Sequence, residues 1–255
     1  MSRFRWLLVL GILAGLVLLF FNRLAFSGQI LARGDTFLYF YPYWQAAADH
    51  LAAGQLSLWN EHLFMGAPFL ANSQAGLLYP LNWPLWALLP TPYAVSASII
   101  LHIIIAAVGT YLAARRCYAL ARPAALLAAV LFALGGYLTA QVEHVNQVQG
   151  LAWLPWLLAV WGPVSAVPVN RVTHMRRVLA VSLLFSLQFL AGHTQTVFIS
   201  GIGFTIWLLL SYLGRWRAAP EAASFWRALR PVLWLLPVGL LALLLVAAQL
   251  LPTFE

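Results

Sequence analysis

Residues 93–116 read YAVSASIILHIIIAAVGTYLAARR, an apolar run that ends at two adjacent arginines. A membrane-spanning helix needs about 20 mainly apolar residues, and positive charge collects at the cytoplasmic ends of such helices. This stretch therefore predicts a transmembrane helix over Tyr93–Ala114 whose carboxyl end, at Arg115 and Arg116, faces the cytoplasm.

The composition of the whole chain also indicates a membrane protein. The 255 residues are 63% hydrophobic and 8% charged, whereas soluble domains are about 45–50% apolar and about 25% charged. The net charge of +8 comes from 14 arginines, and these flank apolar runs. Topology and contact with anionic lipid explain them, so nucleic acid is not an expected partner. Cys117 is the single cysteine, which predicts neither a disulfide nor a zinc site.

Apolar runs of similar length recur along the rest of the chain. They predict an all-α integral membrane protein, a single module over residues 1–255, with about seven transmembrane helices. The predicted helices are Trp6–Phe26, Tyr93–Ala114, Pro123–Ala140, Gly150–Ala166, Val178–Ala191, Thr196–Leu213 and Pro231–Leu251. The first is too long for a signal peptide and no small-residue cleavage site follows it, so we interpret it as an uncleaved anchor.

Charge alternates between the connections of these helices. Twelve of the 14 arginines precede the first predicted helix or lie in the connections after the second, fourth and sixth. Five of the six acidic residues, all except Glu221, fall on the opposite side. This predicts a multi-pass protein of the cytoplasmic (inner) membrane, with its N-terminus in the cytoplasm and those five carboxylates on the outer face.

One outer connection, Ser27–Pro92, is too long to be a simple link between helices. Within it, Tyr43–Ala53 has the pattern of an amphipathic helix, with Trp44 on its apolar face. We expect this helix to lie along the outer surface with its aromatic face in the lipid headgroups. The apolar segment Leu77–Leu89 contains two prolines and is too short to span, so we expect it to dip into the interface or to be re-entrant.

Asp35 is the sharpest candidate for chemistry. It follows the first predicted helix by a few residues, next to Gly34, which allows the backbone to turn. A carboxylate at the membrane surface can act as a base or bind a cation. It could equally cap a helix that begins near Thr36. Asp49, on the polar face of the predicted amphipathic helix, is interpreted as a solvated charge.

The second outer connection, Gln141–Gln149, holds Glu143 and His144 side by side, with Asn146 close by. An acid and an imidazole at a membrane surface can bind a divalent ion or position a phosphate. A hydrated loop explains the same residues equally well.

His193 and Gln195 lie in a very short turn between the fifth and sixth predicted helices. Polar residues at such depth tend to be functional, but they can also hydrogen-bond neighbouring helices. His102, inside the second predicted helix, is more typical of an interhelical hydrogen bond than of a ligand. The sequence contains no P-loop, dinucleotide fingerprint, HExxH motif or nucleophile elbow, so ATP-driven transport by this chain alone is not expected.

The long outer connection and two later motifs resemble the YfhO-like bacterial membrane proteins. The similar motifs are Gly34-Asp35, Tyr41-Pro42, GQLSLWN at 54–60, Gly66-Ala67-Pro68, ANSQ at 71–74, LYPL at 78–81, GHTQ at 192–195 and QLLPTFE at 249–255. Their order and approximate spacing match over nearly the whole chain. Family members are longer, and this chain stops inside a motif that normally continues, so we expect it to be an N-terminal fragment.

The family is assigned to the GT-C class of integral membrane glycosyltransferases. The resemblance implies transfer of a sugar from a polyprenyl-phosphate carrier to a glycan or wall-polymer acceptor in the envelope, at the outer face. By position it implies Asp35 as the catalytic residue and Glu143 as a second acidic position. Many class members carry paired acidic residues, but Thr36 follows Asp35 here, so metal dependence stays open.

These inferences suggest an inverting displacement in which Asp35 deprotonates the acceptor hydroxyl and Arg33 offsets phosphate charge. The residues expected to bind substrate are Arg33, Glu143, His144, Asn146, His193 and Gln195. If a divalent cation, Mg²⁺ or Mn²⁺, is needed, its expected ligands are Asp35, Glu143 and His144.

One alternative is a polytopic transporter or lipid flippase, which predicts charged pairs or broken helices at mid-membrane. The other is a non-catalytic envelope scaffold, which would not need the carboxylates.

Overall fold

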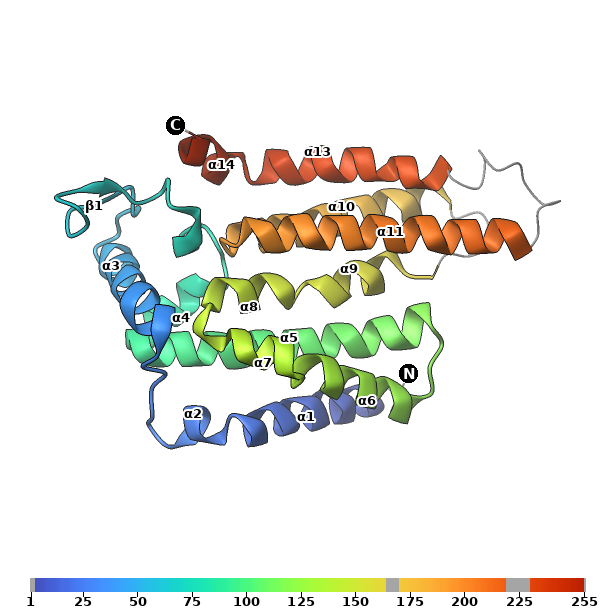
Figure 1. Ribbon diagram of the computed structural model, residues 1–255, viewed down its shortest axis with the longest axis horizontal. Helices are drawn as coiled ribbons and strands as arrows, with labels where there is room; N and C mark the ends of the chain where they lie inside the picture. The colour runs from blue at the N-terminus through green and yellow to red at the C-terminus, as the bar shows by residue number, and fades with distance from the viewer. Residues whose placement is uncertain (1–2, 164–169, 219–229, 255) are drawn as a thin grey trace.

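The computed structural model describes residues 3–163, 170–218 and 230–254, and this part of the chain is almost entirely helical. Figure 1 shows most of the helices side by side along the length of the molecule. These helices are α1 (Arg3–Phe20), α5 (Thr91–Cys117), α6 (Arg122–Ala133), α7 (Gly136–Ala140), α8 (Val145–Leu151), α9 (Leu154–Trp161), α10 (Arg171–Leu190), α11 (Thr194–Ala218) and α13 (Leu235–Leu245).

Short elements complete the described chain. They are α2 (Asn22–Phe26), the π-helix η1 (Thr36–Phe40), α3 (Tyr41–Ala52), α4 (Asn82–Leu88), α14 (Ala247–Phe254) and the 3₁₀ helices η2 (Ser73–Ala75), η3 (Gln141–Glu143) and η5 (Arg230–Trp234). Strands β1 (Trp59–Asn60) and β2 (Ala67–Pro68) form an antiparallel hairpin.

Three helical stretches are long and apolar enough to cross a membrane: α5, α11 and Arg122–Glu143, which comprises α6, α7 and η3. A fourth candidate is the pair Val232–Leu245 and Ala247–Phe254, which bends by 73°. The apolar helix Phe4–Phe20 is shorter than these. The described chain is thus an α-helical protein with three or four candidate membrane spans.

The predicted seven spans correspond to these elements only in part. Three of them match α5, Arg122–Glu143 and α11. The prediction Gly150–Ala166 meets a break at Ala152–Trp153, between α8 and α9, and its last three residues lie outside the described part. The predicted Val178–Ala191 covers most of α10, whose first two turns carry three arginines. The number seven therefore stays a prediction.

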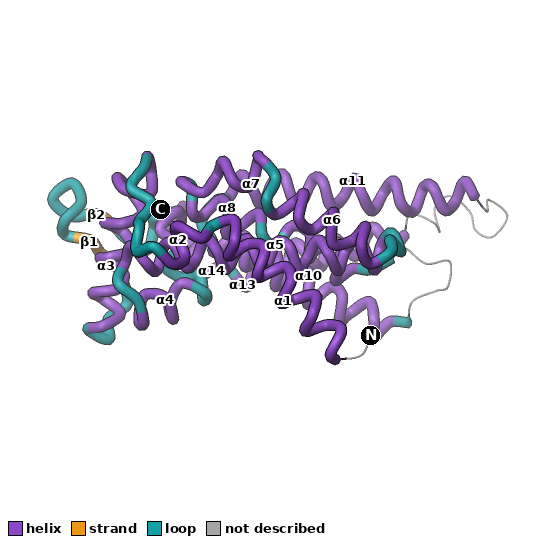
Figure 2. The backbone as a smooth tube through the Cα atoms, turned by 90° about the horizontal axis from the view of Figure 1, so that it is seen from below, coloured by secondary structure: helices purple, strands orange, loops and turns teal. Residues whose placement is uncertain are grey.

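The two ends of the bundle differ in charge. At the loop end lie α3, α4, the β-hairpin and α14, whereas the N-terminus and the α5–α6 connection lie at the opposite, arginine end, as Figures 1 and 2 both show. The segments that meet at the arginine end contain Arg115, Arg116, Arg122, Arg171, Arg176, Arg177, Arg215 and Arg217. The chain therefore separates its charges in space as well as in sequence, and which end faces the cytoplasm stays a prediction.

The predicted amphipathic helix exists as α3, but its aromatic face packs on protein. Trp44 is 1% exposed, and its ring meets the ring of Trp86 in α4 edge-on at 5.5 Å between centroids. The expected headgroup contact is therefore wrong for Trp44, because α3 and α4 bury each other's apolar surface. In Leu77–Leu89, helix α4 contacts both α3 and α5, while Leu88 stays 79% exposed. The expected dip into the interface, or re-entrant path, of this segment stays a prediction.

Close helix packing around α5 relies on small residues. Ala125, Ala129 and Ala133 form a fully buried stripe on α6, which packs against α5. Gly109 of α5 leaves room for the indole of Trp156 in α9, because a Cβ at Gly109 would lie only 2.4 Å from that ring. Small residues let helix backbones approach closely in membrane proteins.

Candidate functional site

Two ion pairs connect the first outer segment with the α7–α8 junction. Arg33 Nε lies 3.5 Å from Glu143 Oε2, and His144 Nε2 lies 3.5 Å from Asp35 Oδ2. We call these four residues the cross-loop cluster. The side chains remain accessible, since Asp35 is 58% and His144 40% exposed. The structure thus brings together four of the residues that the sequence singled out.

Local backbone geometry explains how the two segments approach. Gly34 adopts φ +48°, and a Cβ there would lie 2.5 Å from Glu143 Oε2. A side chain at position 34 would therefore collide with the carboxylate as well as strain the backbone. The buried Thr36 hydroxyl donates a hydrogen bond of 3.1 Å to the Glu143 backbone carbonyl, which fixes the register of the two segments.

Asp35 directly precedes the π-helix η1, and its side chain makes no capping hydrogen bond. The capping alternative is therefore not the arrangement found here, and the carboxylate is available for other contacts. Short π-helical turns are rare and frequently mark functional sites. Within η1, Tyr39 donates a hydrogen bond of 3.0 Å to Asn72 Oδ1, and burial raises the pKa of its phenol.

The α10–α11 turn adds His193 beside His144. Burial and the neighbouring His144 lower the pKa of His193. The backbone N–H of Thr196 donates to His193 Nδ1 at 3.2 Å, so in the neutral ring the proton is on Nε2. Asn146 donates a hydrogen bond of 3.3 Å to the Gly192 carbonyl, and it supports the turn from a buried position.

Gln195 and Asp49 lie apart from this arrangement. Gln195 is exposed, and its side chain makes no hydrogen bond within the described residues. Asp49 accepts a hydrogen bond of 2.8 Å from Gln45 on the exposed side of α3. The interpretation of Asp49 as a solvated helix charge therefore agrees with its position, whereas a substrate-binding role for Gln195 stays a prediction.

A buried polar network lies at the same end and was not foreseen as a unit. Its members are Tyr79, Asn82, Ser98, His102 and Gln149, each at most 1% exposed. His102 Nδ1 donates to the Ser98 carbonyl at 2.7 Å, so its Nε2 accepts from the Tyr79 hydroxyl, also at 2.7 Å. Gln149 donates to Asn82 Oδ1 at 2.6 Å and to Ser98 Oγ at 2.9 Å. His102 is thus a hydrogen-bonding residue, as interpreted, although its partner Tyr79 belongs to a loop.

Segment 70–74 is held by two later parts of the chain. Gln249 of α14 donates to the Leu70 carbonyl at 2.6 Å, and Thr253 donates to the Ala71 carbonyl at 3.0 Å. Gly192, at φ +92°, packs so tightly that a Cβ there would lie 2.2 Å from the Ser73 carbonyl oxygen. Three of the motifs in the family resemblance therefore meet at this one segment.

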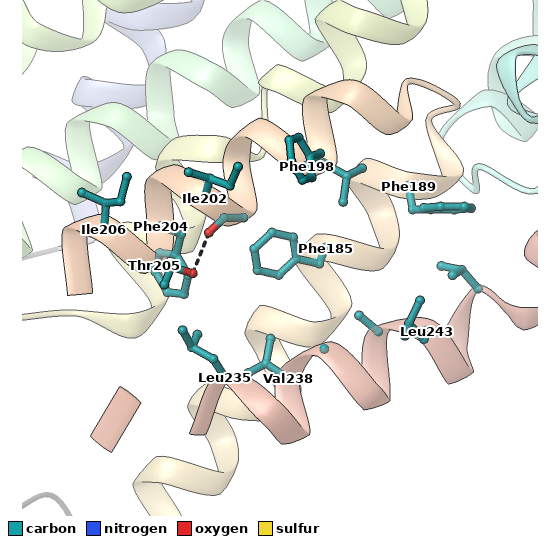
Figure 3. A pocket seen from close by; sticks show the side chains of 15 residues that line it. Phe185, Phe189, Phe198, Ile202, Phe204, Thr205, Ile206, Leu235, Val238 and Leu243 are labelled. Carbon is teal, nitrogen blue, oxygen red and sulfur yellow. Dashed lines mark hydrogen bonds between the residues drawn. The ribbon is translucent and has the colours of Figure 1, made fainter. Parts of the chain in front are cut away.

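An apolar groove of about 520 Å³ runs between α10, α11 and α13. Figure 3 shows Phe185 and Phe189 of α10, Phe198 of α11 and Leu243 of α13 around it. The lining is almost entirely apolar, so the groove suits a hydrocarbon chain. Phe189 is four residues before His193, so the groove extends toward the end that holds the cross-loop cluster.

The predicted metal ligands do not form a metal site in this arrangement. Glu143 faces the Arg33 guanidinium, and Asp35 faces His144. Within the described residues, no group of three or more His, Cys, Asp or Glu side chains could hold a metal ion. A requirement for Mg²⁺ or Mn²⁺ stays a prediction.

Comparison with known proteins found no matching family model, no matching curated protein and no matching solved structure. The resemblance to the YfhO-like proteins therefore remains an expectation that rests on the motifs in the sequence.

Proposed function

We propose that this protein is a membrane glycosyltransferase that moves a sugar from a polyprenyl-phosphate carrier to an envelope glycan or wall polymer on the outer face of the cytoplasmic membrane. The observation that carries the proposal is the cross-loop cluster. Two distant segments contribute carboxylates, a guanidinium and an imidazole to one end of an apolar helix bundle. Transfer from a lipid phosphate needs a base for the acceptor and a cation for the leaving group, and the cluster contains both.

The proposed reaction is an inverting displacement. Asp35 takes the proton of the acceptor hydroxyl, the hydroxyl oxygen attacks the anomeric carbon, and the bond from that carbon to the phosphate oxygen breaks. His144, 3.5 Å from Asp35 Oδ2, holds the carboxylate in place. Arg33 offsets the charge of the departing polyprenyl phosphate, for which its guanidinium turns away from Glu143.

The membrane arrangement in this proposal has seven spans, with the N-terminus in the cytoplasm and the loop end outside. The side-by-side helices (Figure 1) and the concentration of arginines at one end support it. The apolar groove beside α11 would accommodate part of the isoprenoid chain of the donor, and His193 would lie near its phosphate.

The direct test compares lipid-linked glycans and wall polymers in cells with and without the full-length gene. We expect deletion to cause accumulation of a polyprenyl-phosphate sugar and loss of one glycan modification. The wild-type gene and an Asp49→Asn variant should restore the modification, whereas Asp35→Asn should not. An unchanged glycan profile after deletion would contradict the proposal.

A transporter or lipid flippase is the second candidate, and one feature favours it. The α13–α14 pair bends by 73° at Val246, and the chain also breaks between α8 and α9. Discontinuous helices commonly line substrate sites in transporters. The reconstituted full-length protein separates the two functions, because a flippase would move a lipid-linked sugar between leaflets without forming a transfer product.

A further inference from the structure

The arginine end contains a cluster of cations where four helices converge. Arg177 of α10 is half-buried, and its Nη2 would lie 3.4 Å from a Cβ at Gly162, directly after α9. Arg177 interacts electrostatically with Arg116 at the end of α5. Tyr212 of α11 interacts with both Arg177 and Arg215. The ends of α5, α10 and α11 therefore bring Arg116, Arg177 and Arg215 to the same end of the bundle.

The described residues 3–163, 170–218 and 230–254 do not neutralise this cluster. Their acidic residues, Asp35, Asp49, Glu61 and Glu143, belong to segments of the loop end. Neither of the two ion pairs involves Arg177, and its guanidinium makes no hydrogen bond in this part of the chain. A guanidinium has five N–H donors, and burial of a charge without a partner is costly in free energy. Like-charged neighbours add to that cost, so a bound anion would stabilise the cluster.

We infer that Arg116, Arg177 and Arg215 bind the phosphate group of an anionic lipid. The cluster lies at the ends of α5, α10 and α11, and two of these helices are candidate membrane spans. Headgroups of a bilayer around the bundle would lie at this level. Guanidinium groups hold phosphate through charge-assisted hydrogen bonds.

The test uses the full chain in nanodiscs of phosphatidylcholine, with or without phosphatidylglycerol. Native mass spectrometry counts the phosphatidylglycerol molecules that stay bound, and thermal unfolding gives the Tm. Arg177→Gln removes the charge but keeps hydrogen-bond donors. We expect it to reduce retention roughly tenfold, the effect of losing one charge-assisted hydrogen bond, and to abolish the rise in Tm that phosphatidylglycerol causes in the wild type.

Two matched variants frame this result. Arg217→Gln removes the same charge from an exposed residue of α11 outside the cluster, and it should behave as the wild type. Arg116→Gln removes an exposed member of the cluster, so it tests the site without disturbing a half-buried position, and retention should again fall. Retention at the wild-type level in both Arg177→Gln and Arg116→Gln would overturn the inference.

Two further arms identify the source of the anion. Inorganic phosphate added to phosphatidylcholine nanodiscs should leave the Tm unchanged. A rise in Tm equal to that caused by phosphatidylglycerol would mean that the site binds a soluble anion and not a lipid. Glu221 lies outside the described residues, and Glu221→Gln should keep the dependence on phosphatidylglycerol. If Glu221 supplied the counter-charge, the Tm of the wild type would not depend on phosphatidylglycerol and Glu221→Gln would create that dependence, a result that overturns the inference.

Discussion

The cross-loop cluster and the buried polar network lie at the same end of the molecule but are held in opposite ways. In the network, hydrogen bonds of 2.6–2.9 Å join side chains that are almost completely buried. In the cluster, ion pairs at 3.5 Å join side chains that are 26–81% exposed. A buried network must satisfy all its members, whereas an exposed cluster can exchange its partners for a ligand. The buried network is therefore suited to stabilising the fold, and the exposed cluster to binding and converting a substrate.

Asp35→Asn is expected to give the largest effect, and it tests whether the cross-loop cluster carries out the chemistry. The change keeps the size of the side chain but removes the base, so we expect turnover to fall about 10²–10⁴-fold in the full-length protein. The free energy of unfolding should change by no more than about 0.5 kcal/mol, because the site is exposed. The measurements are single-turnover transfer of a lipid-linked sugar and thermal unfolding in detergent.

Asp49→Asn is the matched control, since it removes a carboxylate from the exposed side of α3, and it should keep most of the activity. Normal turnover in Asp35→Asn, combined with an inactive Glu143→Gln, would move the base to Glu143. If all three variants are active, the glycosyltransferase proposal loses its physical basis.

Gln149→Leu gives the next largest effect and acts on stability. It leaves Asn82 Oδ1 without its 2.6 Å donor in a fully buried position. We expect a loss of about 2 kcal/mol, which corresponds to a fall in Tm of about 4–8 °C. Gln195→Leu makes the same replacement at an exposed residue and should shift the Tm by about 1 °C or less. Equal shifts in the two variants would show that the network does not stabilise the loop end.

The Arg33–Glu143 pair gives the smallest effect. A double-mutant cycle with Arg33→Gln and Glu143→Gln should yield a coupling free energy below about 1 kcal/mol, because Arg33 is 81% exposed. Added salt should reduce that coupling further. A coupling free energy above about 2 kcal/mol that does not fall with added salt would mean that the pair stabilises the fold as a buried network does, and that the cluster is not free to exchange its partners.

Apolar length predicted the long helices correctly, but it missed where helices break. The runs that became α5 and α11 are uninterrupted, and their bounds differ from the predicted ones by only a few residues. The run Gly150–Ala166 is just as apolar, yet the helix breaks before Pro155, which lies in the first turn of α9. Proline lacks the N–H donor that a continuous helix would need there. Pro155 in the sequence therefore indicated the helix break, but a count of apolar residues does not take proline into account.

Residue chemistry identified the cluster but not its pairing, and it missed the network. Asp35, Glu143 and His144 stand out because carboxylates and imidazoles are rare in this chain. Their contacts form because two distant segments meet, and the hydrogen bond from Thr36 to Glu143 joins residues 107 positions apart. A local sequence pattern does not encode such a contact. Likewise, an apolar face on α3 indicates burial but not what covers it. Trp44 packs on Trp86 and not on lipid for that reason.

The hydrogen bonds between α14 and segment 70–74 can form only late in the synthesis of the chain. The hydrogen bonds from Gln249 to Leu70 and from Thr253 to Ala71 span 179 and 182 positions. At about 5–20 residues per second, a ribosome makes segment 70–74 roughly 10–40 s before these partners exist. During that interval the nascent chain must keep the Leu70 and Ala71 carbonyls hydrated or protected, and these contacts at the loop end form only once α14 has been made.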